Sequence, residues 1–146
     1  MITRADVVRE LRTWAYPKPT PFRHQASLRG VGTDCIGVVI GVARELGIAL
    51  AAQFDASEEI KGYGREPDPV MLLRACNALL DPCTDPLPGD ILLMRFQAEP
   101  QHFGIISAPE YIIHAYASAR RVVENRIDDL WRSRIVRAYS YRGISG

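Results

Sequence analysis

Residues 30–47 read GVGTDCIGVVIGVARELG, which predicts a loop, a cysteine and then a buried helix that ends at Gly47. Thr33 or Asp34 can supply the side-chain oxygen that caps the N-terminus of this helix. Residues 36–43 are all apolar or glycine, so little of the helix can face water. We therefore expect a central helix against which the rest of the chain packs.

Two glycines inside this helix indicate a close neighbour. An interior glycine costs roughly 1 kcal/mol relative to alanine. Gly37 and Gly41 are four residues apart, so they share one face of the helix. Their spacing predicts that another backbone segment packs closely against this face.

Cys35 falls in the first turn of the predicted helix, and this position has two interpretations. Unpaired amide groups and the helix dipole favour an anion there, and they lower the pKa of a cysteine thiol. An unpaired cysteine is also commonly a small buried hydrophobe. This stretch alone leaves both interpretations open, and a base elsewhere in the chain has to decide between them.

The composition is that of an ordinary soluble globular protein, with 47% hydrophobic and 24% charged residues among 146. At this length we expect one domain that spans residues 1–146. The net charge is +1, and the acidic residues concentrate in residues 49–100. This distribution argues against a continuous surface for nucleic acid.

The N-terminal residues lack the charged-then-apolar pattern of a signal peptide, and no apolar run approaches the ~20 residues of a membrane span. We therefore expect no membrane span, and delivery to any target outside the cytoplasm by something other than a classical signal. Cys35, Cys76 and Cys83 are an odd number of cysteines without a CxxC pair, so neither a disulfide framework nor a zinc ribbon is indicated. A bridge between Cys76 and Cys83 stays open; without it, Cys76 belongs to the core and Cys83 to a loop.

The hydrophobic period changes from helical to alternating part-way along the chain. Polar loops are expected at residues 22–31 and, as a surface excursion, at 55–69. Helices are expected at residues 5–14, 35–46, 48–54 and 70–80. Strands are expected at residues 91–96, 102–107, 111–116, 121–124 and 135–141. Helices followed by antiparallel strands predict an α+β fold, with the N-terminal helices packed on the sheet.

Two of the three histidines, His102 and His114, lie in neighbouring predicted strands. A hairpin turn centred on Ala108 or Pro109 pairs residues whose numbers have an even sum, and both imidazoles then point to the same face. A loop of even length would make the sum odd and place them on opposite faces. The simplest turn therefore brings the two rings together.

A cysteine at a helix N-terminus and two histidines on one sheet face can form a nucleophile, a base and an orienting group. The same three side chains, Cys35, His102 and His114, could instead bind zinc, although they lack the paired spacing of structural zinc sites. They could also be ordinary packed residues. The residues alone favour catalysis without excluding the other two.

Five short stretches, in order, resemble the NlpC-type family of bacterial cell-wall cysteine peptidases, and most closely those of phage tails and gene transfer agents. They are residues 20–25 (TPFRHQ), 33–37 (TDCIG), 88–92 (PGDIL), 102–106 (HFGII) and 113–115 (IHA). The resemblance covers nearly the whole chain and implies a papain-like α+β fold. It implies Cys35 as nucleophile, His102 as general base and His114 as the orienting residue, with no metal and no cofactor. The family cleaves peptide stems of peptidoglycan, commonly between γ-D-glutamate and diaminopimelate.

This sequence departs from the family pattern at two positions near the predicted site. Phe22 stands where the family often has a tyrosine whose phenol helps the oxyanion site, so backbone amides near Cys35, with help from His24, would have to serve. Ile36 stands where the family commonly has a serine that helps to read the stem peptide. Asp34 is kept, and it has two compatible roles, as helix cap and as substrate contact. His24 and Phe22 are the other candidate substrate contacts; His24 lines the cleft or is an ordinary histidine of a surface loop.

The sequence thus predicts a peptidoglycan-degrading cysteine peptidase whose partners are a stem peptide and the proteins of a phage-like tail or baseplate. Its expected location is a virion-like particle assembled in the bacterial cytoplasm and acting on the cell wall. The alternative is a structural tail-tip component that keeps the fold with weak or no catalysis. Cys35 and the two histidines favour the enzyme, whereas the lost phenol and serine favour the alternative.

Overall fold

The computed structural model describes residues 1–64, 68–96 and 99–146. Its helices are α1 (Arg4–Ala15), α2 (Cys35–Leu46), α3 (Leu50–Asp55), α4 (Glu58–Lys61), α5 (Pro69–Leu79), the 3-10 helix η1 (Ala117–Ala119) and α6 (Asp129–Ser133). Its strands are β1 (Ser27–Leu28), β2 (Gly32–Thr33), β3 (Asp81–Cys83), β4 (Ile91–Phe96), β5 (Glu99–Ala108), β6 (Tyr111–Tyr116), β7 (Arg121–Arg126) and β8 (Ile135–Ser140). The predicted α+β fold is confirmed.

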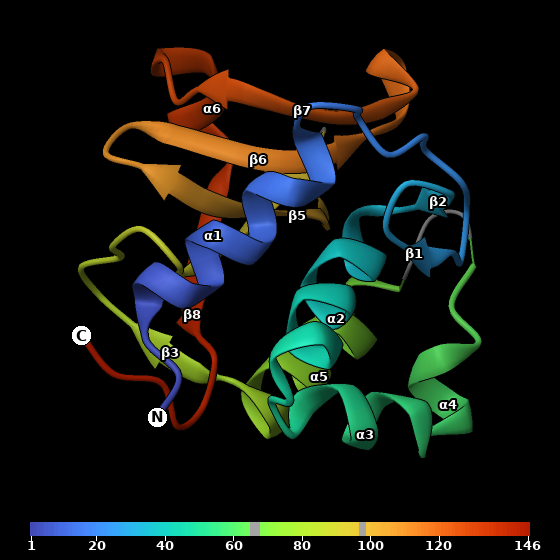
Figure 1. The fold of residues 1–146 in the computed structure, drawn as a ribbon. Helices are drawn as coiled ribbons and strands as arrows, with labels where there is room; N and C mark the ends of the chain where they lie inside the picture. The colour runs from blue at the N-terminus through green and yellow to red at the C-terminus, as the bar shows by residue number, and fades with distance from the viewer. Residues whose placement is uncertain (65–67, 97–98) are drawn as a thin grey trace.

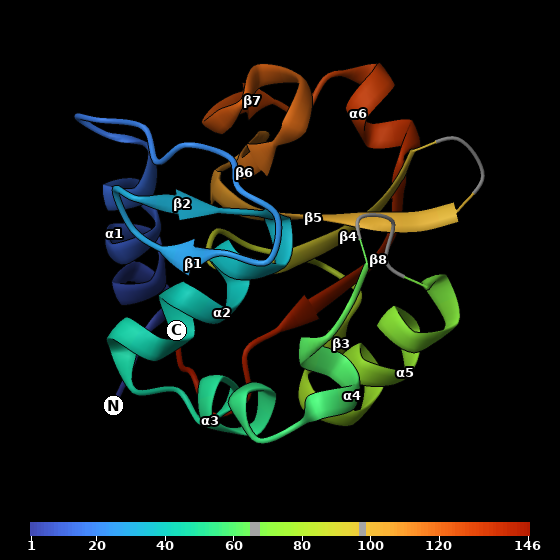
Figure 2. The ribbon, with the colours of Figure 1, turned by 90° about the vertical axis from the view of Figure 1, so that its right-hand side faces the viewer.

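Six strands form one antiparallel sheet in the order β3-β8-β4-β5-β6-β7 (Figure 1). Alternate residues along β4 enter two separate cores: Ile91 and Leu93 join α1 and α2 in the larger one, and Leu92 and Met94 join Trp131 of α6 in the smaller one. In the turned view of Figure 2, α6 lies at the opposite end of the molecule from α3. The sheet therefore buries apolar side chains on both faces.

The central helix α2 forms as its sequence predicts. The Asp34 carboxylate accepts a hydrogen bond from the Gly37 N–H at 2.7 Å and caps the first turn. Gly47 ends the helix in the left-handed region, with φ of 73°. Every residue from 36 to 43 is buried. Both the cap and the end that the sequence indicated are therefore confirmed.

The glycine face of α2 contacts two different neighbours. A Cβ atom on Gly37 would overlap the backbone carbonyl oxygen of Ala26, so a backbone segment does pack there as predicted. A Cβ atom on Gly41 would overlap the indole ring of Trp14 in α1. The prediction of a close backbone is thus confirmed at Gly37, whereas at Gly41 the neighbour is a side chain.

The predicted loops contain short elements that the periodicity did not indicate. The loop at 22–31 includes β1, which pairs with β2, and the segment after α5 includes β3, which pairs with β8. The excursion at 55–69 includes α4, while residues 65–67 lie outside the described residues. Elements of two to four residues are too short to show a period, so only their tertiary pairing defines them.

All three cysteines are free. Cys76 is buried in the larger core, as expected. Cys83 is partly buried in β3, not in a loop, and its thiol lies 3.9 Å from the Asp90 carboxylate. The bridge between Cys76 and Cys83, which the sequence left open, is not formed.

The β5–β6 hairpin places both histidines on one face of the sheet, as predicted, but its turn differs from the predicted one. Its turn contains two residues, Pro109 and Glu110, because Ala108 pairs with Tyr111. A bulge between Ile106 and Ala108 then shifts the register, so that Ile106 pairs with Ile112. This even sum places His102 and His114 on the same face of the sheet, as predicted, although the predicted turn was wrong.

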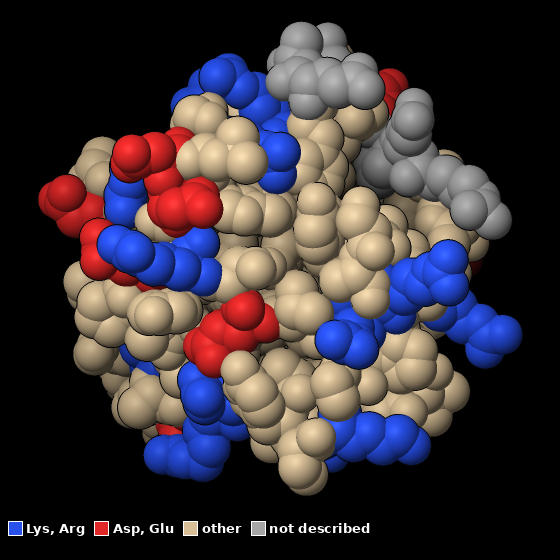
Figure 3. Space-filling view, turned by 90° about the horizontal axis from the view of Figure 1, so that it is seen from above, with Lys and Arg blue, Asp and Glu red and all other residues tan. Residues whose placement is uncertain are grey.

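The charged surface is divided into small groups. On the face in Figure 3, lysine and arginine side chains lie in several separate groups, interrupted by uncharged surface and by Asp and Glu. On this face the basic residues form no continuous stripe of the kind that binds nucleic acid. Among the described residues, no helix has the length and apolar character needed to cross a membrane.

Candidate active site

Cys35 is the first residue of α2 and is partly buried beside β5. The backbone amide of Phe103 in β5 is close enough to the thiol to lower its pKa. The thiol therefore lies beside the backbone of the residue that follows His102.

The two imidazoles form a hydrogen-bonded chain that ends on an asparagine. His102 Nε2 lies 2.7 Å from His114 Nδ1, and His114 Nε2 lies 2.6 Å from the carbonyl oxygen of Asn125. A carbonyl oxygen only accepts, so His114 Nε2 carries the proton and its Nδ1 accepts from His102 Nε2–H. The remaining nitrogen of His102, Nδ1, then holds a free lone pair. The chain therefore fixes His102 in the tautomer that a general base requires.

No hydrogen bond joins the thiol to this base in the described part of the chain. The backbone amides of Phe103, Ile36 and Cys35 influence the pKa of the thiol, whereas His102 is hydrogen-bonded to His114. The two rings lie on the face of the sheet that Trp131 covers, while α2 packs on the other face. Catalytic hydrogen bonds are often long in proteins without substrate and tighten in the complex.

The ionisation of the three groups differs from what the helix terminus predicted. Burial, followed by the charge of Asp34, raises the pKa of the Cys35 thiol to about 12, despite the lowering effect of the backbone amides. Burial holds the pKa of His102 well below its ordinary value, and the His114 ring and the Arg134 guanidinium lower it further. At neutral pH the site therefore holds a neutral thiol beside a neutral imidazole. The predicted lowering of the Cys35 pKa is wrong for the protein without substrate.

Asp34 is buried, and protein donors surround its carboxylate. One oxygen accepts from the Gly37 N–H; the other accepts from the Gln25 N–H at 2.8 Å and from the Tyr63 hydroxyl at 2.6 Å. Tyr63 is buried as well, and its pKa is raised by burial and by the charges of Asp34 and Cys35. Its hydroxyl therefore lies in the neighbourhood of the thiol, and it comes from a segment that the sequence did not implicate.

The two other predicted substrate contacts lie at different places. His24 is partly exposed, with its Nδ1 3.9 Å from Asp34 and its ring edge against Tyr63. Phe22 packs against the larger core, and its backbone pairs with Arg120 and Thr33. His24 thus lies close to Asp34, whereas Phe22 is part of the packing that supports the loop.

The fold of the chain is similar to that of known structures, although no family model and no curated protein match it. NlpC2 from Trichomonas vaginalis is similar over 93% of this chain, with 18% identity and a TM-score of 0.60. A lipoprotein-like protein of the NLP/P60 family from Staphylococcus aureus is similar over all of it, with 13% identity and a TM-score of 0.65. The NlpC/p60 domain of the peptidoglycan hydrolase SagA is similar over 95%, with 17% identity and a TM-score of 0.61.

The fold is that of NlpC/P60 domains. The chain spans 46% and 44% of the first two proteins, and 99% of the SagA domain. At these identities the likeness shows the NlpC/P60 fold alone, which is the papain-like fold that the sequence predicted.

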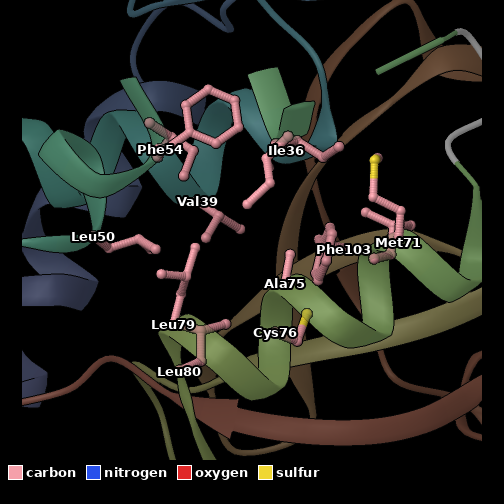
Figure 4. Close-up of a pocket in the computed structure, with 13 residues that line it drawn as sticks. Ile36, Val39, Leu50, Phe54, Met71, Ala75, Cys76, Leu79, Leu80 and Phe103 are labelled. Atoms are coloured by element: carbon pink, nitrogen blue, oxygen red, sulfur yellow. The ribbon is translucent and has the colours of Figure 1, made fainter. Parts of the chain in front are cut away.

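An apolar cavity lies behind the site, between α2, α3, α5 and β5 (Figure 4). Ile36, which stands at the serine position of the NlpC-type pattern, lines it together with Phe103 and Met71. Its volume is about 50 Å³, whereas sites for small molecules typically have ~300 Å³ or more. Ile36 therefore fills the core next to Cys35 and presents no polar group to a substrate.

No group of three histidine, cysteine, aspartate or glutamate side chains among those that the structure describes is arranged to hold a metal ion.

Four residues of the site were not predicted from the sequence, namely Tyr63, Asn125, Trp131 and Arg134. Only Asn125 had a usable signal, because it extends the predicted strand at 121–124. It also alternates in phase with Val123, the partner of His114.

The buried His114 predicts a loss of stability in acid. Burial lowers the pKa of His114 from 6.5 to about 4, so the folded protein binds fewer protons than the unfolded chain between these values. The free energy of unfolding should therefore fall as the pH drops from 6.5 to 4, by about 3 kcal/mol from this residue. Urea unfolding at several pH values would measure it. His114→Gln should flatten the slope, while His24→Gln, outside the pair, should keep it; an unchanged slope in His114→Gln would contradict the assignment.

Proposed function

We propose that this protein is a cysteine peptidase that hydrolyses the peptide stems of peptidoglycan. The observation that carries the proposal is the chain Asn125–His114–His102, which leaves His102 Nδ1 as an acceptor, while Cys35, at a helix N-terminus, lies against the neighbouring Phe103 backbone. The similarity in fold to a domain of the peptidoglycan hydrolase SagA supports the choice of substrate.

The neutral resting state defines the order of proton transfer. As the Cys35 sulfur attacks the carbonyl carbon of the scissile amide, its proton moves to His102 Nδ1. The Asn125–His114 pair stabilises the resulting imidazolium through His114 Nδ1, which accepts from His102 Nε2–H. The imidazolium then protonates the leaving amine, and the acyl group remains on sulfur as a thioester. Water, deprotonated by His102, releases the acid and restores the thiol.

The finer parts of the proposal are the scissile bond, between γ-D-glutamate and diaminopimelate, and the location on a phage-like or gene-transfer-agent tail. Both rest on the resemblance of the five sequence stretches, including 33–37 and 102–106, to peptidases of that kind. Tail or baseplate proteins would then be the partners that carry the peptidase to the wall.

A structural tail component with weak catalysis is the second candidate, and one observation favours it. The raised pKa of Cys35 and the lowered pKa of His102 mean that no thiolate–imidazolium pair exists before substrate binds. The thiol must then lose its proton during the attack, which is slower unless the substrate aligns the two groups.

Incubation of the purified protein with peptidoglycan or a stem tetrapeptide, followed by mass spectrometry, separates the two candidates. A peptidase should release peptides with a new N-terminus at diaminopimelate, whereas a structural component should leave the substrate intact. Cys35→Ala should lose all release above background, and Cys83→Ala, which removes a thiol in β3, should retain it. Loss of activity in EDTA and recovery with zinc would instead favour the zinc site.

A further inference from the structure

Arg134 lies at the end of α6 and is held in place by aromatic rings. Its guanidinium carbon is 4.6 Å from the centre of the Trp131 ring and 5.0 Å from the centre of the Phe96 ring. Stacking of this kind fixes the plane of a guanidinium while its N–H groups remain free to donate. Arg134 is therefore presented in a defined orientation on the half-buried surface.

The same rings connect Arg134 to the candidate base. The Phe96 ring is 4.8 Å from the His102 ring, and Trp131 packs edge-on against His114 at 4.9 Å. The guanidinium is also close enough for its charge to lower the pKa of His102. Arg134 thus lies on the side of the sheet that carries both imidazoles.

Among the carboxylates whose side chains the structure describes, none forms an ion pair with Arg134; the side chains of residues 59, 65–67 and 97–100 lie outside that description. The ion pairs among the described side chains use seven other arginines, at positions 4, 9, 12, 29, 44, 132 and 142. On the neighbouring turn, Arg132 already pairs with Glu110. A fixed guanidinium near the candidate base, with no described carboxylate on it, is suited to bind an anionic group of a substrate.

We propose that Arg134 is a specificity-determining residue that binds a free carboxylate next to the scissile amide. This inference rests on the proposed function and deepens it. A γ-linked glutamate keeps its α-carboxylate a few bonds from the carbonyl that is attacked, and this carboxylate can pair with the two parallel N–H groups of a guanidinium. Diaminopimelate, on the leaving side, is the other source of a carboxylate.

Three synthetic stem peptides distinguish these sources: one with both carboxylates free, one with the glutamate carboxylate amidated, and one with the diaminopimelate carboxylate amidated. We expect the wild-type protein to prefer the first over the second by ~10–100-fold in kcat/KM, the range for a hydrogen bond to a charged group. Arg134→Gln should lose that factor on the first peptide, mainly through a higher KM, and should cleave the second as the wild type does. Arg137→Gln, an exposed arginine on β8, is the matched control and should change neither.

Each other outcome has a distinct meaning. Equal losses on all peptides in Arg134→Gln, or no loss on any, would overturn the role of Arg134. A loss on every peptide except the one amidated at diaminopimelate would move the bound carboxylate to the leaving side. If the wild type cleaves none of them, the proposed function fails. In that case, calorimetry can measure the affinity of Cys35→Ala for the same peptides. Equal affinities for the peptides with a free and with an amidated glutamate carboxylate would contradict the inference about Arg134.

Discussion

His102→Ala is expected to lower kcat/KM on a stem peptide by ~10²- to 10⁴-fold, the usual contribution of a general base. The effect should be at the upper end, because the pKa of the Cys35 thiol is raised to about 12 and almost no thiolate forms without the base. The loss should appear in kcat, since the ring takes part in the chemical step.

His114→Ala should be less damaging, and the comparison tests the assigned roles. It removes the acceptor of His102 Nε2–H, so the base is no longer held in one tautomer but is still present. His114→Gln offers an amide oxygen in its place and should recover part of the rate if its reach is sufficient.

Pre-steady-state rates of the three histidine variants, with folding checked by circular dichroism, give the required comparison. If His114→Ala abolishes turnover while His102→Ala keeps most of it, the two histidines have the opposite roles. Equal losses in both would mean that the pair acts as one unit.

Gly37→Ala is expected to destabilise the protein by about 3 kcal/mol, the upper end of the range for overpacking. The added Cβ atom would overlap the carbonyl oxygen of Ala26 and lie 2.5 Å from the Thr33 hydroxyl. A backbone carbonyl cannot rotate away as a flexible side chain can, so the loop that packs on α2 has to shift. The free-energy cost of accommodating the added methyl group should therefore exceed the gain of roughly 1 kcal/mol in helix propensity that alanine has over glycine.

Urea unfolding measures this effect directly. Gly64→Ala is the control, because a Cβ atom there meets nothing within 4 Å and its φ lies outside the left-handed region. It should change the free energy of unfolding by less than ~0.5 kcal/mol. Equal stability of Gly37→Ala and the wild type would show that the loop does not pack against α2 as described.

The sequence alone predicted the regular elements of the fold, because each carries its own local signal. The helix that begins at Cys35 has its cap, its apolar run and its terminal glycine within residues 34–47, and all of these are as predicted. The strand at 91–96 was found with its bounds unchanged. The resemblance of a few short stretches added the papain-like architecture, which the structural neighbours show.

The same-face placement of His102 and His114 was only half determined by the sequence. Their spacing allowed it for an odd loop, but the loop has two residues, and the bulge between Ile106 and Ala108 restores the parity. A bulge depends on how the strand packs against its neighbours, so no local pattern reveals it. The correct face followed from an incorrect turn.

The sequence by itself therefore determined the helices, the main strands and the three residues proposed for catalysis, since hydrophobic period and capping act between residues close along the chain. Only the tertiary structure decided what surrounds those residues. Asn125 on His114, Tyr63 on Asp34 and Arg134 beside His102 are contacts between segments 11 to 32 residues apart. Such contacts arise when the sheet and helices pack, and they carry no periodic signal. The same packing set the ionisation of the site, because burial outweighed the effect of the helix terminus on Cys35.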